Sequence, residues 1–242
     1  MIDFTPIPVL FTIKSVKLYT HGFLMALAFL ISSFLASRHF KDKDEFWNLM
    51  FFSFLGSIIG ARLLYVLFYY KQFDSFIQIF QIWHGGLVSY GGLIGGFLFA
   101  YLFIKHKKLN FLEYADKIAP YIALGLAIGR IGCFLVWDDY GIASNLPWSV
   151  NVDFPRHPTQ IYHSIADLII FLILKPLQKK NLKKGSILFL FILLYSIFRF
   201  IIDFFRAYPS KWLFLAPSQW LCLLIIMIVV IIMFKNKLFN KK

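Results

Sequence analysis

The chain has 242 residues, of which 60% are hydrophobic and 20% aromatic, and its formal net charge is +13. This composition lies far outside that of soluble globular proteins and indicates a polytopic membrane protein with the lipid bilayer as a partner. The cations lie in short segments between apolar stretches, which argues against nucleic acid as the reason for the positive charge. Cys133 and Cys222 both lie among apolar residues, so we expect no disulfide framework, no metal site and no cofactor.

Seven apolar stretches follow one another along the chain, each about 17 to 25 residues long, as a bilayer-crossing helix requires. They cover residues 18–36, 46–70, 86–104, 118–137, 161–178, 186–206 and 216–234. No internal repeat or linker separates them. We therefore expect an all-α polytopic membrane protein with seven transmembrane helices in a single domain, residues 1–242.

The basic residues predict the orientation of these helices. Most of the 25 Lys and Arg residues follow the first, third, fifth and seventh stretches. Because such residues collect on the cytoplasmic side of a membrane, we expect the N-terminus outside and the C-terminus in the cytoplasm. The polar loop near residues 138–158 then faces outward, and we expect chemistry at the outer leaflet.

The first motif in chain order is rich in glycine and runs Trp83-His-Gly-Gly-Leu-Val-Ser-Tyr90-Gly-Gly-Leu-Ile-Gly-Gly96. Glycines in a membrane allow close helix packing and re-entrant turns, and packing accounts for most of them. Packing accounts less well for the polar side chains of His84 and Tyr90, which become candidates for proton handling. His21 and Arg62, in the first two stretches, are further candidate site residues.

Arg130 lies in the middle of the fourth stretch, within Gly129-Arg-Ile-Gly-Cys-Phe-Leu-Val-Trp-Asp-Asp-Tyr-Gly141. Arginine does not lose its proton, and an unpartnered one at the centre of a bilayer costs roughly 2.5 to 3.5 kcal/mol. A lipid phosphate is the natural anion to neutralise it. Asp138 marks the membrane edge, and Gly141 allows an unwound exit. The alternative is a helix with one snorkelling arginine and an acidic loop cap; for Cys133 we expect apolar surroundings and no covalent role.

The segment Arg156-His157-Pro158-Thr159-Gln160 precedes the fifth stretch. Proline at a helix start, with Thr159 and Gln160 in the first turn, predicts that a helix begins here. His157 and Gln160 are therefore candidates both for a site and for a purely structural role at the start of the helix.

The sixth stretch contains Phe198-Arg199-Phe-Ile-Ile-Asp203-Phe-Phe-Arg206. Spacings of four and seven predict that Arg199, Asp203 and Arg206 share one helical face, and Tyr195 adds a phenol one turn earlier. One interpretation is a structural ion pair inside the bundle. The other is that Asp203 orients one arginine while the second arginine holds an anion.

Taken in this order, the motifs resemble the prolipoprotein diacylglyceryl transferase family of bacterial inner-membrane enzymes, from about residue 18 to residue 230. The resemblance rests on Gly60-Ala-Arg62, Gly-Gly-Leu-Ile-Gly, Gly129-Arg-x-Gly, His157-Pro-Thr-Gln-Ile-Tyr, Arg199-x-x-x-Asp-Phe-Phe-Arg206 and Ser218-Gln219. The chain departs from the family pattern at several positions: Tyr90 replaces a histidine, Cys133 and Val136 replace asparagines, and Asp138, His163 and Asp203 replace glutamates.

The resemblance implies a transferase of the bacterial cytoplasmic membrane. It would move the diacylglyceryl group of phosphatidylglycerol to the lipobox cysteine of a preprolipoprotein, which it recognises with its signal peptide. The implied catalytic residues are Tyr90, Arg130, His157, Tyr195 and Arg199, and the implied phosphatidylglycerol-binding residues are Arg62, Arg130, Asp138, Gly141, Gln160, Arg199, Asp203 and Arg206. Two alternatives stay open, an inactive relative that binds phosphatidylglycerol or a signal peptide and a transporter of lipids or anions.

Overall fold

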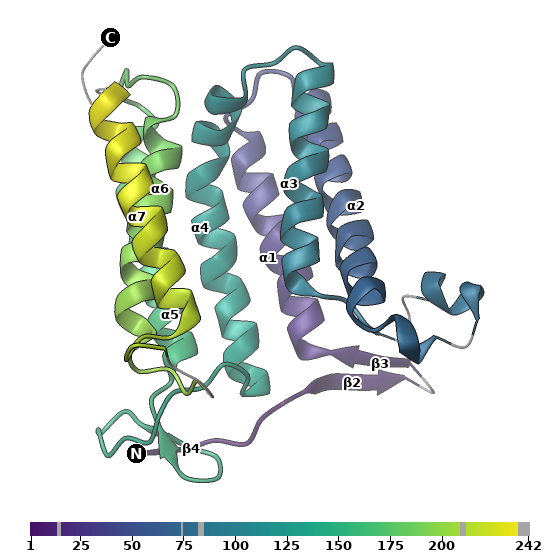
Figure 1. The fold of residues 1–242 in the computed structure, drawn as a ribbon, viewed down its shortest axis with the longest axis vertical. Helices are drawn as coiled ribbons and strands as arrows, with labels where there is room; N and C mark the ends of the chain where they lie inside the picture. Colours follow the sequence, from purple (N-terminus) through teal and green to yellow (C-terminus); the bar gives the residue numbers. More distant parts are fainter. Residues whose placement is uncertain (14–15, 74, 82–84, 209–211, 237–242) are drawn as a thin grey trace. The chain divides into compact units, whose positions relative to one another are not determined.

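The computed structural model describes residues 1–242 except 14–15, 74, 82–84, 209–211 and 237–242. The described part of the chain is mostly helical, and each predicted apolar stretch corresponds to one α-helix (Figure 1). The helices are α1 (Thr20–Ser37), α2 (Lys43–Phe68), α3 (Ser89–His106), α4 (Phe111–Val136), α5 (Thr159–Leu177), α6 (Ser186–Ile202) and α7 (Pro217–Asn236). Five of them, namely α1, α2, α4, α5 and α7, are long and apolar enough to cross a membrane, and α6 is a shorter apolar helix. The prediction of a polytopic membrane protein is thus confirmed.

The prediction of an all-α fold omitted several short strands. β1 (Ile2–Asp3) pairs in parallel with β4 (Val150–Asn151), which pairs in antiparallel with β5 (Pro155–Arg156). A hairpin of β2 (Val9–Ile13) and β3 (Val16–Tyr19) precedes α1. The strands of the first sheet have two residues each, too few to show the alternation of polar and apolar residues that identifies a strand in a sequence.

The chain divides into two compact units, Met1–Ala36 with Ala115–Lys242 and, separately, Ser37–Tyr114. In the first unit, glycines bring α4 close to α1: a Cβ on Gly125 would lie 3.0 Å from the Ser32 hydroxyl, and one on Gly129 would lie 2.9 Å from the Met25 sulfur. Figure 1 shows α5, α6 and α7 side by side. A buried core joins α4, α5 and α6 and consists of Ala119, Ala123, Ile170, Leu174 and Ile187.

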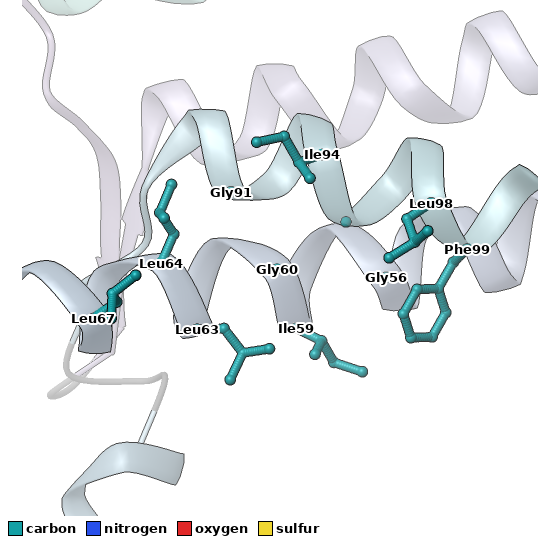
Figure 2. Close-up of a pocket in the computed structure, with 11 residues that line it drawn as sticks. Gly56, Ile59, Gly60, Leu63, Leu64, Leu67, Gly91, Ile94, Leu98 and Phe99 are labelled. Atoms are coloured by element: carbon teal, nitrogen blue, oxygen red, sulfur yellow. The ribbon is translucent and has the colours of Figure 1, made fainter.

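The second unit is built on the hairpin of α2 and α3, joined by the short helices η1 (Tyr70–Gln72) and η2 (Phe76–Phe80). Glycines meet where the two helices cross: a Cβ on Gly60 would lie 2.3 Å from the Gly91 carbonyl oxygen, and one on Gly95 would lie 2.2 Å from that of Gly56. Beside this contact lies an apolar groove of about 270 Å³, lined by leucine, isoleucine and phenylalanine side chains (Figure 2). The glycines of α3 thus pack helices, as predicted.

Candidate functional site

The loop between α4 and α5 is fixed by backbone hydrogen bonds within itself and to the segment that follows α6. The Gly141 N–H donates to the His157 carbonyl at 2.9 Å, and the Ile142 N–H donates to the Phe205 carbonyl at 2.9 Å. A Cβ on Gly141 would lie 2.6 Å from the carbonyl oxygens of both His157 and Phe205, so only glycine fits without a shift. Gly141, predicted to bind lipid, therefore lies where three backbone segments meet.

This backbone arrangement moves Arg206 off the predicted helix. α6 ends at Ile202, and Arg206 forms an isolated β-bridge with Gly141. The prediction that Arg199, Asp203 and Arg206 share one helical face is therefore wrong for Arg206. The chain leaves the helix because its backbone groups pair with the loop after α4.

Asp139 connects two arginines. Its Oδ2 accepts a hydrogen bond from Arg130 Nη1 at 3.1 Å, and its Oδ1 accepts one from Arg206 Nη2. The side chains of Arg130 and Arg206 are 14% and 17% exposed, and that of Asp139 is 30% exposed. One carboxylate is thus shared by a guanidinium of α4 and a guanidinium beyond α6.

The motif placed Asp138 at the site, whereas the structure places its neighbour Asp139 there. Asp138 Oδ1 accepts the backbone N–H of Asp139 at 2.8 Å, and Asp139 has a left-handed φ of 61°. Thr159 Oγ1 donates to the Asp139 carbonyl at 2.7 Å, and Gln160 Nε2 donates to the Asp138 carbonyl at 2.6 Å. The predicted helix start at Thr159 is confirmed, and Gln160 holds the acidic loop. Nothing in the local sequence separates two adjacent aspartates, so the role of Asp139 was missed.

Asp203 and Tyr195 fix Arg199. The Tyr195 hydroxyl accepts a hydrogen bond from Arg199 Nη1 at 3.0 Å, and Asp203 Oδ2 lies 3.8 Å from Arg199 Nε. The Asp203 side chain is fully buried, and its Oδ2 also accepts a hydrogen bond from Ser218 Oγ of α7 at 2.6 Å. The predicted grouping of these side chains on α6 is confirmed, while their part in chemistry stays a prediction.

Three guanidiniums converge in the first unit. Arg130 and Arg206 share Asp139, and Arg199 is an electrostatic neighbour of Arg130. We call Arg130, Arg199 and Arg206 the arginine cluster. Asp139 and Asp203 pair with these arginines directly, and the buried Asp167 of α5 is a further electrostatic neighbour of Arg130 and Arg199. A guanidinium binds the oxygens of phosphate well. The arrangement can bind an anion.

Arg62 is held in another way. Its guanidinium donates to the backbone carbonyls of Gln78, Ile79, Gln81, Gly85 and Gly86, at 2.7 to 3.4 Å. A guanidinium has five N–H groups, so every donor of Arg62 is used. In the structure Arg62 has a structural role, and its binding of phosphatidylglycerol stays a prediction. It fixes the connection between α2 and α3, and none of its N–H groups is left to hold a phosphate.

The family of the chain follows from its similarity to known proteins. The sequence model of prolipoprotein diacylglyceryl transferase matches residues 8–235. The chain belongs to the prolipoprotein diacylglyceryl transferase family. It is similar to proteins named phosphatidylglycerol–prolipoprotein diacylglyceryl transferase, with 35% identity to that of Idiomarina loihiensis over 95% of this chain and 93% of that protein. The protein of Mannheimia succiniciproducens is 36% identical over 82% of this chain and 79% of its own length. That of Thermotoga maritima is 35% identical over 82% of this chain and 74% of its own length. Family membership confirms the resemblance and makes the chain a transferase.

His163, Asp203 and Cys133, which are among the positions where the chain departs from the family pattern, have polar neighbours. His163 Nε2 lies 3.9 Å from Asp203 Oδ1, and neither atom has a hydrogen-bond partner among the described residues. Asp167, one turn further along α5, is 2% exposed. Cys133, expected among apolar groups, has its sulfur 3.9 Å from Nδ1 of His21. The four-residue spacing of His163 and Asp167 inside an apolar helix is the sequence feature that predicts these two buried polar residues on one face of α5.

The predicted proton-handling residues belong to both units. His157 lies in the first unit with Nδ1 3.0 Å from the Tyr162 hydroxyl, and burial lowers the pKa of His157. Tyr90 is the second residue of α3 in the other unit, where it is 70% exposed. His84 lies outside the described residues.

Proposed function

We propose that this chain transfers the diacylglyceryl group of phosphatidylglycerol to the lipobox cysteine thiol of preprolipoproteins. The names of its relatives support this reaction and this pair of substrates. The observation that supports the location of the site is the arginine cluster, in which guanidiniums from α4, from α6 and from the segment after α6 lie around a partly exposed carboxylate.

In this proposal the non-bridging oxygens of the lipid phosphodiester bind to the guanidiniums of Arg130, Arg199 and Arg206. Tyr195 and Asp203 keep the Arg199 guanidinium in place. The thiolate sulfur attacks the carbon of the diacylated glycerol that bears the phosphate. A carbon–sulfur bond forms as the bond from that carbon to the phosphate oxygen breaks. The electron pair of the broken bond stays on the phosphate oxygen, and glycerol phosphate leaves. Guanidiniums already in position stabilise this developing charge, and they do so more strongly away from water.

The thiol must lose its proton for this step, because the thiolate is the nucleophile and an ordinary thiol has a pKa of about 8.5. Positive charge near the lipobox cysteine favours the thiolate. Tyr90, Tyr195 and His157 remain the proposed proton-handling groups. Of the three, Tyr195 contacts the arginine cluster directly.

We also propose that all seven helices cross the cytoplasmic membrane of a bacterium as one domain, with the N-terminus outside and the C-terminus in the cytoplasm. The distribution of Lys and Arg along the chain supports this orientation. The loop that carries Asp139 then faces outward, where the signal peptide of a secreted preprolipoprotein presents its lipobox cysteine.

The test is to incubate the purified protein with phosphatidylglycerol and a lipobox peptide. A peptide adduct with the mass of a diacylglyceryl group, together with released glycerol phosphate, is the expected result. A peptide with serine in place of the cysteine is the control and gains no mass. Retention of phosphatidylglycerol without adduct would identify an inactive binder, and anion flux into vesicles without a peptide would identify a transporter.

A further inference from the structure

We propose that Asp139 is an exchangeable counter-ion of the arginine cluster. Its carboxylate takes the place that the lipid phosphate takes, and it turns away when the phosphodiester binds. This inference rests on the proposed binding of phosphatidylglycerol by the cluster.

The geometry of Asp139 is that of an internal anion. One carboxylate oxygen binds Arg130 of α4 at 3.1 Å, and the other binds Arg206 beyond α6. A phosphodiester offers the same arrangement, since its two non-bridging oxygens share one negative charge and are well suited to two guanidiniums. A second anion arriving at Arg130 and Arg206 would meet the charge of Asp139, and like charges placed side by side cost several kcal/mol in general. The phosphodiester and the carboxylate therefore compete for the same two arginines.

Exposure shows which carboxylate can leave. The Asp203 side chain is fully buried and accepts a hydrogen bond from Ser218, so moving it would leave buried charges unpaired. The Asp139 side chain is 30% exposed. Its carboxylate can leave the two guanidiniums and bind water instead, at a smaller cost in free energy than the carboxylate of Asp203 would incur. Asp139 is the mobile partner of the cluster and Asp203 the fixed one.

The backbone of Asp139 is held by hydrogen bonds that do not involve its own carboxylate. The Asp139 N–H donates to Asp138 Oδ1 at 2.8 Å, and the Asp139 carbonyl accepts from Thr159 Oγ1 at 2.7 Å. Rotation about the side-chain bonds alone then releases the carboxylate. The loop does not need to unfold for the exchange to occur.

The exchange also explains how the product leaves. The phosphodiester of the substrate carries one negative charge, whereas a phosphate monoester carries about −1.5 to −2 near neutral pH. Without the carboxylate of Asp139, the arginine cluster would therefore hold glycerol phosphate more tightly than the lipid. Asp139 returns to Arg130 and Arg206 and displaces the product.

The test is steady-state kinetics on Asp139→Asn with phosphatidylglycerol and a lipobox peptide. We expect KM for phosphatidylglycerol to fall on the order of tenfold, because the competing charge is gone. Added glycerol phosphate should inhibit this variant at correspondingly lower concentration, and kcat should fall as product release slows. Asp153→Asn is the matched control. It removes the same charge from the same loop, where Asp153 pairs with Arg156, and should leave KM unchanged.

Asp139→Glu keeps the charge and should retain a KM at or above that of the unchanged protein. An unchanged or higher KM in a folded Asp139→Asn protein overturns the proposal. The proposal is also overturned if neither Asp139→Asn nor Asp139→Glu gives folded protein, because Asp139 would then belong to a structural ion pair. Arg130→Lys separates this failure from failure of the proposed site. If KM for phosphatidylglycerol rises in Arg130→Lys but is unchanged in Asp139→Asn, the exchange is refuted while the proposed lipid site stands. If neither variant alters KM, the arginine cluster does not bind the lipid.

Discussion

Arg62 and Arg130 both lie inside long apolar helices, yet the structure holds them in opposite ways. Arg62 donates all five of its N–H groups to backbone carbonyls of the connection between α2 and α3. Arg130 donates a hydrogen bond to the carboxylate of Asp139, which is itself partly exposed. The first guanidinium is saturated by neutral carbonyls, and the second is paired with a charged side chain.

The difference shows that the partners of a buried cation, more than its depth, decide its role. Backbone carbonyls are neutral and cannot leave without unfolding the loop, so Arg62 acts as an anchor. Carboxylate side chains carry charge and can rotate, so the arginine cluster can exchange one anion for another. Substitutions that separate loss of folding from loss of lipid binding test this distinction.

The largest effect is expected when a cluster arginine is removed. Arg130→Ala and Arg199→Ala should each lower the rate of diacylglyceryl transfer by roughly 10²-fold to 10³-fold, the usual consequence of removing a pre-placed donor from a developing charge. The measurement is the yield of peptide adduct by mass spectrometry.

The Arg130 and Arg199 variants should still insert into the membrane. Arg199→Ala should also unfold at a lower temperature, because it leaves the buried carboxylate of Asp203 without its arginine. Lysine at either position keeps the charge but loses the paired donors, and should recover part of the rate. Full activity in either alanine variant would contradict the assignment of the cluster to phosphate.

Arg62→Ala should act on stability instead. Five carbonyls lose their donor at once. Their residues are only partly buried or exposed, so water can replace some of the lost hydrogen bonds, and we expect the free energy of unfolding to fall by about 1–3 kcal/mol. Thermal unfolding in detergent measures it, and KM for phosphatidylglycerol in the protein that remains folded should shift far less than in the cluster variants. An Arg62→Ala protein of normal stability with a raised KM would restore Arg62 as a lipid ligand.

Gly141→Ala tests the backbone that places Arg206 beside Asp139. The added Cβ would lie 2.6 Å from the carbonyl oxygens of His157 and Phe205, and overpacking of this kind costs roughly 1–3 kcal/mol. We expect a lower unfolding temperature together with a several-fold change in KM for phosphatidylglycerol. Gly22→Ala is the matched control, since a Cβ there meets nothing within 4 Å. Equal behaviour of the two variants would refute the close contact at Gly141.

The smallest effect concerns pH. Burial lowers the pKa of His157 below its ordinary value of 6.5. Below pH 6.5 the unfolded chain therefore takes up a proton that the folded chain accepts only at lower pH, so stability falls as the pH drops through 6.5. The unfolding temperature should fall less between pH 7.5 and pH 5.5 in His157→Phe, which keeps an aromatic ring beside Phe205, than in the unchanged protein. An equal fall in both proteins would show that His157 does not cause it.

Much of the fold could be predicted because the relevant information is local. The seven helices follow from apolar length, and the start of α5 follows from proline, threonine and glutamine in its first turn. The contact of Tyr195 with Arg199 follows from helical spacing. The extent of α6 could not be predicted in this way, because the segment after Ile202 remains apolar while its backbone pairs with a loop from another part of the chain.

Composition, apolar length and motifs establish the membrane class, the helices, the family and the presence of arginines that require partners. Which partners these arginines have depends on the tertiary structure. Arg206 and Asp139 are 67 residues apart in the chain and meet because Gly141 lets two backbone segments cross. Helix formation depends on neighbours within a few residues, whereas the hydrogen-bond partners of a buried charge depend on the path of the whole backbone.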